Sequence, residues 1–372
     1  MNGIGESLFE SVPNFSEGRD GAVIDAIAEA AGGAAHLLDV DADGDHNRTV
    51  VSVAGFGPHL VAALLGSIHV AVALLDVRTH RGVHPRVGVA DVVPIVPLDS
   101  TPLSVCQEVA SELGERIWSE LRVPVYFYGR GQSLADIRGG RGRLDIGGPD
   151  LHPAAGAVCV GARPKLVAFN VILRGVDVGA ARALARSIRE SGGGLRGVHA
   201  LVFELPGGAV QLSMNLFRLE ETTPAIVIEE LDRRGVSIVS QQVVGLCPAV
   251  ATNPAAAGRL LEARLAGTAA RAGAARCFKR GDNEHVALAR RLRREADGLA
   301  ALGADQLDLL GGAERAAALV PVLKVAGVLD GELEAMLGAA ATGLREAVTS
   351  ETRSTYAARV AALERRIGPP AI

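Results

Sequence analysis

The sequence is organised around residues 76–97, DVRTHRGVHPRVGVADVVPIVP. The first eleven residues of this stretch hold two histidines, three arginines and a glycine, and a valine-rich run follows them. A short run rich in β-branched residues predicts a buried β-strand. Side chains that can transfer protons therefore stand directly before a buried strand, and we predict that the chemical centre of the protein lies here.

His80 and His84 are the candidate acid–base residues of this stretch. A neutral imidazole can take up a proton and return it near pH 7. The flanking Arg81 and Arg86 are expected to lower the pKa of a nearby histidine and to bind a substrate carboxylate. Spacing does not decide which histidine acts, and a surface loop with incidental histidines is the alternative interpretation.

A zinc site is a poorer interpretation of the same two histidines. Their spacing is that of the H-E-x-x-H helix, in which both imidazoles lie on one continuous face. Gly82 lies between the histidines, Pro85 follows them, and no glutamate follows His80. Because a proline interrupts a helix, the segment is predicted to be a loop.

Residues 39–44, DVDADG, resemble the opening of a calcium-binding loop. Such a loop needs a bidentate glutamate at its twelfth position, which is Val50 here. Two interpretations remain open: a solvated acidic turn, or a segment in which Asp41 and Arg48 face a site at the strand ends. We therefore predict no metal.

Composition narrows the class of protein. The chain has 372 residues, more than one typical domain, and is 48% hydrophobic and 22% charged, as expected of a soluble globular protein. A net charge of -4 and an aromatic content of 3% argue against a nucleic-acid surface. No signal peptide is visible, and the uncharged residues 53–75 are better interpreted as a buried helix from about residue 58 than as a membrane span.

Four cysteines stand in apolar runs without C-x-x-C spacing: Cys106, Cys159, Cys247 and Cys277. They are expected to be buried thiols of a cytoplasmic protein rather than disulfides or zinc ligands.

Strands and helices are predicted to alternate in two matching halves. The first half has strands at 8–13, 36–40, 48–54 and 124–128, helices at 22–31, 58–75 and 102–121, a turn at 14–18, a polar loop at 41–47 and a glycine-rich loop at 130–156. The second half has strands at 166–173, 198–205, 209–216 and 236–244, with helices at 178–190 and 224–234.

This order predicts an α/β (α+β) fold of two similar ferredoxin-like subdomains, whose sheets are covered by helices. The predicted domains are residues 1–160, 161–252 and a helical extension of unknown role, 253–372. The place in the second half that matches the opening stretch, 233–242, has no histidine, so catalysis is expected in the first half, with the second helping to close a groove.

Seven short motifs, spread over about residues 8–250, resemble the glutamate formimidoyltransferase family. They are VPNFSEG (12–18), LLDVDADGDHNRTV (37–50), HRGVHPRVGVADVVP (80–94), VPVYFYG (123–129), GARPKLVAFNVIL (161–173), QLSMNL (211–216) and SQQVVGLCP (240–248). Their common order makes the resemblance more specific than any one motif. The segment from about residue 253 does not resemble the cyclodeaminase domain that accompanies some members.

The resemblance implies two α/β subdomains with folate bound between them, and transfer of a formimino group from N-formimino-L-glutamate to N5 of tetrahydrofolate in histidine degradation. The histidine that precedes Pro-Arg in the family corresponds to His84, and the acidic residue of the second motif to Asp41. A single histidine of near-neutral pKa could take the N5 proton and give one to the leaving nitrogen.

The site residues implied by the resemblance form three groups. The catalytic candidates are His84 and Asp41, and the substrate-binding candidates are Asn14, Arg48, His80 and Arg86. The folate-binding candidates are Gly148, Pro149, Asp150, Leu151, His152, Pro153, Ala154, Ala155 and Gly156, with Asn170 in the second half.

Tetrahydrofolate is the expected co-substrate, and a homodimer without nucleic-acid or membrane partners is expected. Two alternatives share the folate groove. One is a 5-formyltetrahydrofolate cyclo-ligase-like enzyme, and the other is a non-catalytic folate-binding or scaffold protein.

Overall fold

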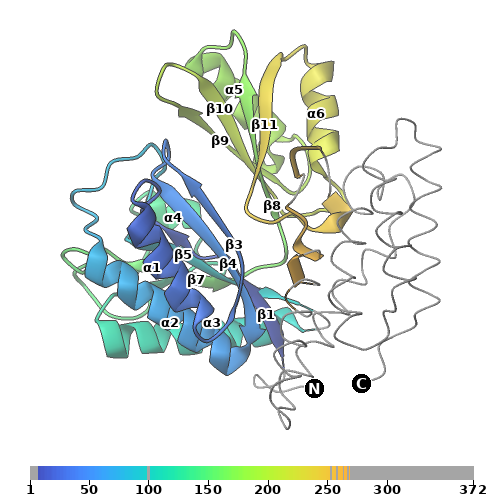
Figure 1. Cartoon of the computed structure of the whole chain (residues 1–372). Coiled ribbons are helices and arrows are strands. Elements are labelled where there is room, and N and C mark those ends of the chain that lie inside the picture. The colour runs from blue at the N-terminus through green and yellow to red at the C-terminus, as the bar shows by residue number, and fades with distance from the viewer. Residues whose placement is uncertain are drawn as a thin grey trace, which may run out of the picture. The chain divides into compact units, whose positions relative to one another are not determined.

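The computed structural model describes residues 7–98, 101–251, 254–256, 259–262, 264–265 and 268 (Figure 1). They group into two compact units. The first takes in the described parts of Met1–Lys165, Ile172–Ala185 and Leu201–Ser213; the second takes in Leu166–Val171, Arg186–Ala200 and the described residues after Ser213. Most of the expected helical extension, and Cys277, lie outside the described residues. The three domain boundaries drawn from the sequence stay predictions.

A seven-stranded sheet forms the first half of the chain. Its strands are β1 (Leu8–Ser11), β2 (Asn14–Phe15), β3 (His36–Asp43), β4 (Arg48–Phe56), β5 (Ala90–Pro97), β6 (Val125–Phe127) and β7 (Val158–Ala162). β1 and β2 follow each other between β4 and β5, β3 pairs with the outer side of β4, and β7 and β6 continue beyond β5. The pairings of β7 with β5 and β6 are parallel, and the pairings among β1 to β5 are antiparallel.

Three helices cover one face of this sheet: α1 (Gly21–Gly32), α2 (Gly57–Leu74) and α3 (Leu103–Arg116), the last continued by a π-helical turn at Ile117–Leu121 (Figure 1). The Asp20 carboxylate accepts hydrogen bonds from the Ala22 and Val23 amides and so caps the start of α1. Pro58 stands in the first turn of α2, where its missing N–H costs no hydrogen bond.

α2 is the one helix among the described residues that is long and apolar enough to cross a membrane. Half of it is buried inside the protein, with Leu60, Leu64 and Ile68 fully covered, and it packs against α1 and α3. These contacts agree with the expected buried core helix.

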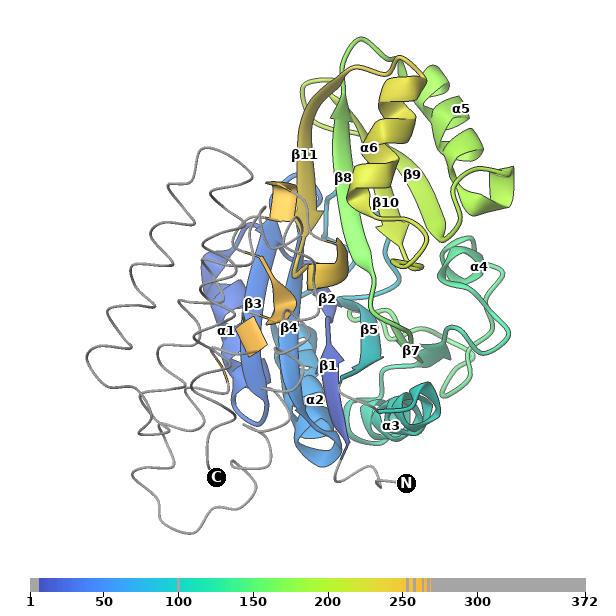
Figure 2. The same ribbon diagram turned by 90° about the vertical axis from the view of Figure 1, so that its right-hand side faces the viewer.

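The second half of the chain forms a four-stranded sheet with two helices on one face (Figure 2). Its elements are β8 (Val167–Leu173), α5 (Val178–Ile188), β9 (Val198–Glu204), β10 (Val210–Leu216), α6 (Pro224–Arg233) and β11 (Ile238–Val244). The spatial order β11-β8-β10-β9 places the last strand beside the first and the third between the first and second, which is the ferredoxin-like order.

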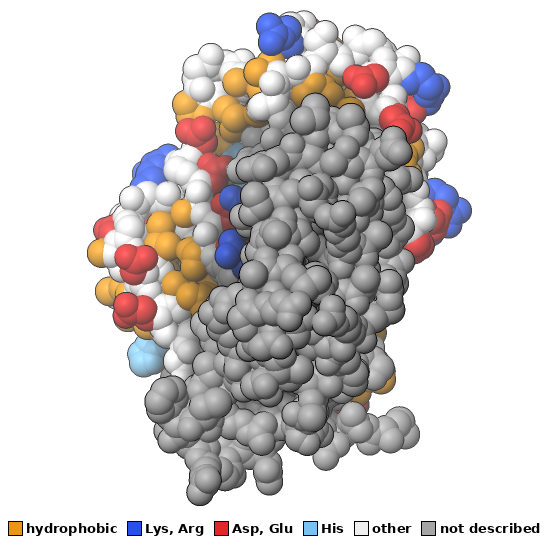
Figure 3. All heavy atoms as spheres, turned by 45° about the vertical axis from the view of Figure 1, so that its right-hand side comes forward, with side chains coloured by type: hydrophobic (Ala, Val, Ile, Leu, Met, Phe, Trp, Pro, Cys, Tyr) orange, Lys and Arg blue, Asp and Glu red, His pale blue; other side chains and the backbone are white. Residues whose placement is uncertain are grey.

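The first half repeats this order and then extends it. β1 with β2, α1, β3, β4, α2 and β5 follow the same βαββαβ path, and α3, β6 and β7 are added at the β5 edge. The predicted mixed α/β fold with helix-covered sheets is therefore confirmed. Charged side chains of both signs, with hydrophobic ones between them, are interspersed on the described part of one face (Figure 3).

Three local predictions were wrong. Asn14–Phe15 is strand β2 and not a turn, because the chain resumes pairing with both β4 and β5 after Pro13. Residues 41–43 belong to β3 and not to a loop, because the β3–β4 pairing continues as far as Asp43 opposite Arg48. The glycine-rich loop contains a short helix, α4 (Leu134–Arg138), which a capping box between Ser133 and Asp136 begins.

Gly88 lies where the backbone before β5 meets the backbone before β7. A Cβ atom at Gly88 would lie 2.2 Å from the Ala157 carbonyl oxygen and 2.5 Å from that of Ala155. We expect Gly88→Ala to destabilise the protein by about 1–3 kcal/mol, because the two segments must separate. Urea unfolding measures this, with Gly21→Ala in α1 as the control, since nothing lies within 4 Å of a Cβ there. Equal midpoints for the two variants would contradict the expectation.

Candidate functional site

A row of paired residues crosses the seven-stranded sheet on one face: Asp41, Val50, Asn14, Val92 and Cys159. Their chain neighbours Val51 and Val93 belong to the apolar core that also contains the helix residues Leu64 and Leu113. Because successive side chains of a strand point to opposite faces, the row lies on the face away from α1, α2 and α3. The candidate site is built on this face.

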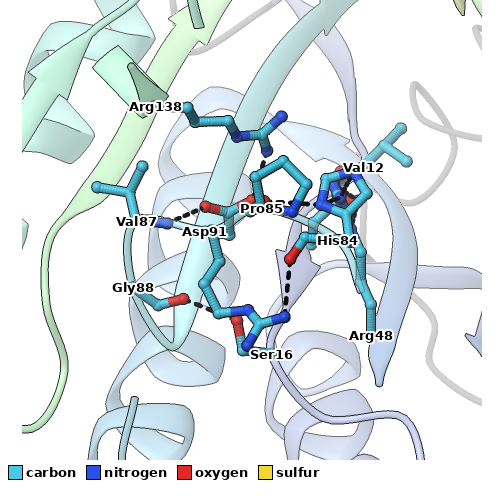
Figure 4. A network of polar contacts seen from close by, with 11 residues as sticks. Val12, Ser16, Arg48, His84, Pro85, Val87, Gly88, Asp91 and Arg138 are labelled. Carbon is cyan, nitrogen blue, oxygen red and sulfur yellow. Dashed lines mark hydrogen bonds and ion pairs between the residues drawn. The ribbon is translucent and has the colours of Figure 1, made fainter. Parts of the chain in front are cut away.

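Asn14 and Arg48 are joined by hydrogen bonds on this face. The Arg48 guanidinium donates to Asn14 Oδ1 from Nε (2.8 Å) and from Nη2 (2.5 Å), and Asn14 Nδ2 donates to the Val12 carbonyl (2.9 Å). Two donors on one amide oxygen fix the plane of the guanidinium. Its third nitrogen, Nη1, lies 2.6 Å from His84 Nδ1 and 2.5 Å from His84 Nε2 (Figure 4).

The Pro85 carbonyl favours one tautomer of His84. Its oxygen lies 2.7 Å from Nδ1 and can only accept, which favours a proton on Nδ1. Arg48 Nη1, which can only donate, lies 2.6 Å from Nδ1 and 2.5 Å from Nε2 and so approaches both ring nitrogens. A neutral imidazole is what a proton acceptor requires.

Burial strongly lowers the pKa of His84, and the positive charges of Arg48 and Arg138 lower it further. Burial also lowers the pKa of Arg48 to about 10. The sequence predicted that Arg81 and Arg86 lower the pKa of a nearby histidine; Arg86 does so for His80, whereas the arginines that act on His84 are Arg48 and Arg138. The near-neutral pKa expected of the catalytic histidine is not found at His84. Arg81 is exposed and donates to the Arg78 and His80 carbonyls, and Arg86 donates to His80 and to the backbone.

His80 occupies a supporting position. Its Nε2 donates to the Asn47 carbonyl (2.8 Å), so Nδ1 is the acceptor of a hydrogen bond from Arg86. Arg86 also donates to the carbonyls of Gly82 (2.9 Å) and His84 (2.7 Å). These bonds hold the loop that carries His84.

Asn47 is a residue of this site that sequence reasoning missed. Its side chain accepts from the Gly18 amide (2.8 Å) and donates to the Arg81 carbonyl (3.0 Å), and its φ is 47°. Asparagine tolerates this left-handed conformation better than most residues. The position just before Arg48 in the second motif was the available signal.

Asp91 and Arg138 were also missed. Asp91 is buried in β5, accepts from the Val87 amide (2.7 Å) and pairs with Arg138 Nη2 of α4 (2.5 Å; Figure 4). Arg138 Nε is buried and has no hydrogen-bond partner among the described residues. For Asp91 the available signal was an aspartate inside a valine-rich strand. For Arg138 the sequence offered no signal, because its partner lies 47 residues away.

The predicted folate loop, 148–156, lies beside the histidine loop. His152 Nδ1 accepts from the Ala154 (3.3 Å) and Ala155 (2.9 Å) amides and shapes the turn. The Val77 and Val89 amides donate to the Ala154 and Ala155 carbonyls at 2.8 and 2.9 Å. The structure therefore brings residues 154–156 next to both ends of the segment that carries His80 and His84.

The remaining predicted residues are placed as follows. Asp41 lies on the same sheet face as Asn14, two strands away, opposite Val50. Asn170 is buried in β8 within the second unit. Among the described residues, no group of three or more histidine, cysteine, aspartate or glutamate side chains could hold a metal.

Replacing Arg48 tests the electrostatics of His84. Arg48→Met removes the nearest positive charge, so the pKa of His84 should rise, while Arg48→Lys should keep it low. A histidine whose pKa is lowered by folding destabilises the protein as pH falls below the unfolded value of about 6.5. Stability should therefore fall less steeply on acidification in Arg48→Met than in Arg48→Lys. NMR titration of the imidazole protons checks the first point, and an unchanged titration would contradict it.

Known proteins match about two-thirds of this chain. Residues 8–163 match the family model of the formiminotransferase domain, N-terminal subdomain. The chain is 36% identical over 269 residues to the glutamate formimidoyltransferase of Thermoplasma acidophilum, which covers 65% of this chain and 88% of that protein. It is 34% identical over 269 residues to the enzyme of that name from Streptococcus pyogenes, covering 66% and 90%.

A longer relative matches over a similar region. The chain is 36% identical over 281 residues to the formimidoyltransferase-cyclodeaminase of Rattus norvegicus, covering 67% of this chain and 52% of that protein. The fold, the matched domain and these identities define a transferase of the formiminotransferase-domain class. The chain belongs to the glutamate formimidoyltransferase family.

Proposed function

We propose that this protein moves the formimino group of N-formimino-L-glutamate to N5 of tetrahydrofolate, with His84 as the base. Family membership supports formimino transfer as a step of histidine degradation and one-carbon metabolism. The folate acceptor and the role of the histidine are our proposal.

The neutral His84 carries this proposal. As N5 attacks the amidine carbon, N5 becomes positively charged and must lose its proton. We assign the acceptance of that proton to His84 Nε2, because the Pro85 carbonyl favours a proton on Nδ1. Substrate binding must move Nε2 out of its contact with Arg48 Nη1 for this to happen.

The charges around His84 suit an anionic substrate. Arg48, Arg86 and Arg138 bring three positive charges, and the buried Asp91 balances one of them. Guanidinium groups bind carboxylates well, so we assign the carboxylates of formiminoglutamate or folate to Arg48 and Arg86. Asn14 holds Arg48 in place, and Asp41 could stabilise the cationic tetrahedral species from the same sheet face.

Tetrahydrofolate is assigned to the loop 148–156, next to the histidine loop, and Asn170 stays a folate contact predicted from the family resemblance. The backbone bonds of Ala154 and Ala155 to the flanks of the histidine loop support this assignment. The proposed chemistry uses no metal. We further propose that the protein acts in the cytoplasm as a homodimer, which sedimentation of the purified protein tests.

One assay separates this function from its alternatives. The purified protein is mixed with tetrahydrofolate and N-formiminoglutamate, and formation of 5-formiminotetrahydrofolate is followed by absorbance. A parallel reaction contains 5-formyltetrahydrofolate and ATP. Product in the first reaction alone supports the transferase. Product in the second alone favours the cyclo-ligase-like alternative, and folate binding without product in either favours the non-catalytic one.

A further inference from the structure

A second histidine, His46, lies beside His84 in the first compact unit and has no role in the mechanism described so far. Its ring centroid is 6.2 Å from that of His84. Phe203, of the β9–β10 hairpin, contacts both rings, at 5.4 Å from His46 and 5.5 Å from His84. His46 is 6% exposed, so the aromatic cluster of His46, His84 and Phe203 keeps most water away from the ring.

Both ring nitrogens of His46 have a hydrogen-bond partner. Nδ1 lies 2.9 Å from Asp43 Oδ2, and a carboxylate accepts, so Nδ1 carries a proton. The Asp43 carboxylate is itself held by the amides of Asp45 and His46, each at 2.9 Å. The bond from His46 is the largest cause that lowers the pKa of Asp43, so this carboxyl group stays ionised beside the ring. An ionised carboxylate balances the positive charge of a ring that has taken a second proton.

The other nitrogen, Nε2, faces the side-chain amide of Gln211 at 3.3 Å. Gln211 is buried, and its amide has an NH₂ at one end and a carbonyl oxygen at the other. The NH₂ group donates to Nε2 of a neutral His46. After rotation of the amide, its oxygen accepts from Nε2–H of a protonated His46. The surroundings of His46 therefore accommodate either protonation state.

His84 differs in this respect. Both of its ring nitrogens face the Arg48 guanidinium, which can only donate, and the positive charges of Arg48 and Arg138 oppose protonation. His84 is therefore neutral before the reaction and can accept a proton, but these charges weaken it as a base and make its protonated form unfavourable. The formimino exchange needs a proton acceptor and a proton donor, because N5 loses a proton and the leaving glutamate nitrogen gains one.

We propose that His46, paired with Asp43, is a second catalytic residue that donates the proton to the leaving glutamate nitrogen. The inference rests on the proposed transfer from formiminoglutamate to N5.

N5 forms a bond to the amidinium carbon, the C=N electron pair moves to the terminal nitrogen, and His84 takes the N5 proton. His46, which enters the reaction with both ring nitrogens protonated, then gives its Nε2 proton to the glutamate nitrogen. That carbon–nitrogen bond breaks, its electron pair leaves with glutamate, and the terminal nitrogen re-forms the C=N bond. His46 recovers its proton from His84, whose ring centroid lies 6.2 Å from its own, or from water.

His46→Gln tests the proposal, because glutamine keeps a polar side chain of similar reach beside Gln211 and cannot act as an acid. We expect kcat with formiminoglutamate to fall about 10²-fold or more, with KM changed little. Asp43→Asn keeps an acceptor for Nδ1 but removes the charge, and it should also lower kcat. His59→Gln, at an exposed position of α2, is the matched control and should behave as the wild type.

The choice of formimino donor distinguishes a general-acid role of His46 from a structural one. A formimino derivative of a fluorinated glutamate has a less basic leaving nitrogen that needs less help from an acid. The defect of His46→Gln should shrink at least several-fold with this donor, while the defect of His84→Ala should not. A structural role of His46 predicts equal losses with both donors, and that result would overturn the proposal.

Two outcomes separate this inference from the proposed function. Wild-type protein that does not transfer from formiminoglutamate contradicts the proposed function itself. Active wild type with His46→Gln within about twofold of it overturns only the role of His46. If His46→Gln does not fold, as circular dichroism shows, Asp43→Asn with the two donors decides by the same criterion.

Discussion

His84→Ala should lower kcat for formimino transfer by about 10²–10⁴-fold, the contribution typical of a positioned acid–base group. Folate should still bind with an affinity within a few fold of the wild type, because the assigned folate loop keeps its backbone bonds to Val77 and Val89. Steady-state kinetics and equilibrium titration with tetrahydrofolate measure the two quantities. The arginines remain in place, so the variant isolates proton transfer from substrate binding.

Free imidazole provides the control for this variant. Removing the ring leaves a space between Arg48 and Phe203 that small imidazoles should enter, and the rate should then rise with imidazole concentration. Rescue would show that the fold and the binding groups survived the substitution. Turnover near that of the wild type in His84→Ala without imidazole would end the assignment of this residue as the base.

Asp91→Ala is expected to give the largest loss of stability, about 3–5 kcal/mol, because it leaves the Arg138 charge buried without its partner. The Asp91 side chain is only 3% exposed, and it also binds the Val87 amide in the histidine loop. Loss of activity should therefore accompany the loss of stability. Chemical denaturation followed by circular dichroism measures the free energy of unfolding.

An exposed ion pair near the same helix serves as the comparison. Arg141 pairs with Asp136 at 2.8 Å, and both side chains are well exposed, so Arg141→Ala should change stability little. Adding Arg138→Met to Asp91→Ala should restore part of the lost stability, because it removes the uncompensated charge. A cost for Asp91→Ala no greater than that of Arg141→Ala would mean that the buried pair is not what holds the loop.

Local patterns predicted most of the elements correctly. The helices over 22–31 and 58–75 differ from α1 and α2 by about one residue at each end. The hairpin around 206–208 forms because Leu205 and Ala209 pair across it, as the two glycines allow. Periodicity and turn residues act over short distances, so one sequence suffices to detect them.

The site was predictable only in part. Gly82 and Pro85 excluded a zinc helix from the sequence alone, but the choice of His84 over His80 came from the resemblance. The capping box at Ser133 was a local signal for α4 that went unused. The pairing of Asp91 with Arg138, and of His46 with Gln211, joins segments 47 and 165 residues apart, and no spacing rule predicts such contacts.

The paired row that crosses the seven-stranded sheet ties the chemistry of this protein to strand alignment. Asn14 and Arg48 face each other only because β2 and β4 pair with Asn14 opposite Val50. Side chains of a strand alternate between the two faces of the sheet. A one-residue shift of β4 would therefore point the Arg48 side chain towards the helix-covered core, and an apolar side chain of β4 would lie beside His84 instead. We therefore expect one residue inserted in β4 to abolish the proposed catalysis, although every side chain assigned to it remains in the sequence.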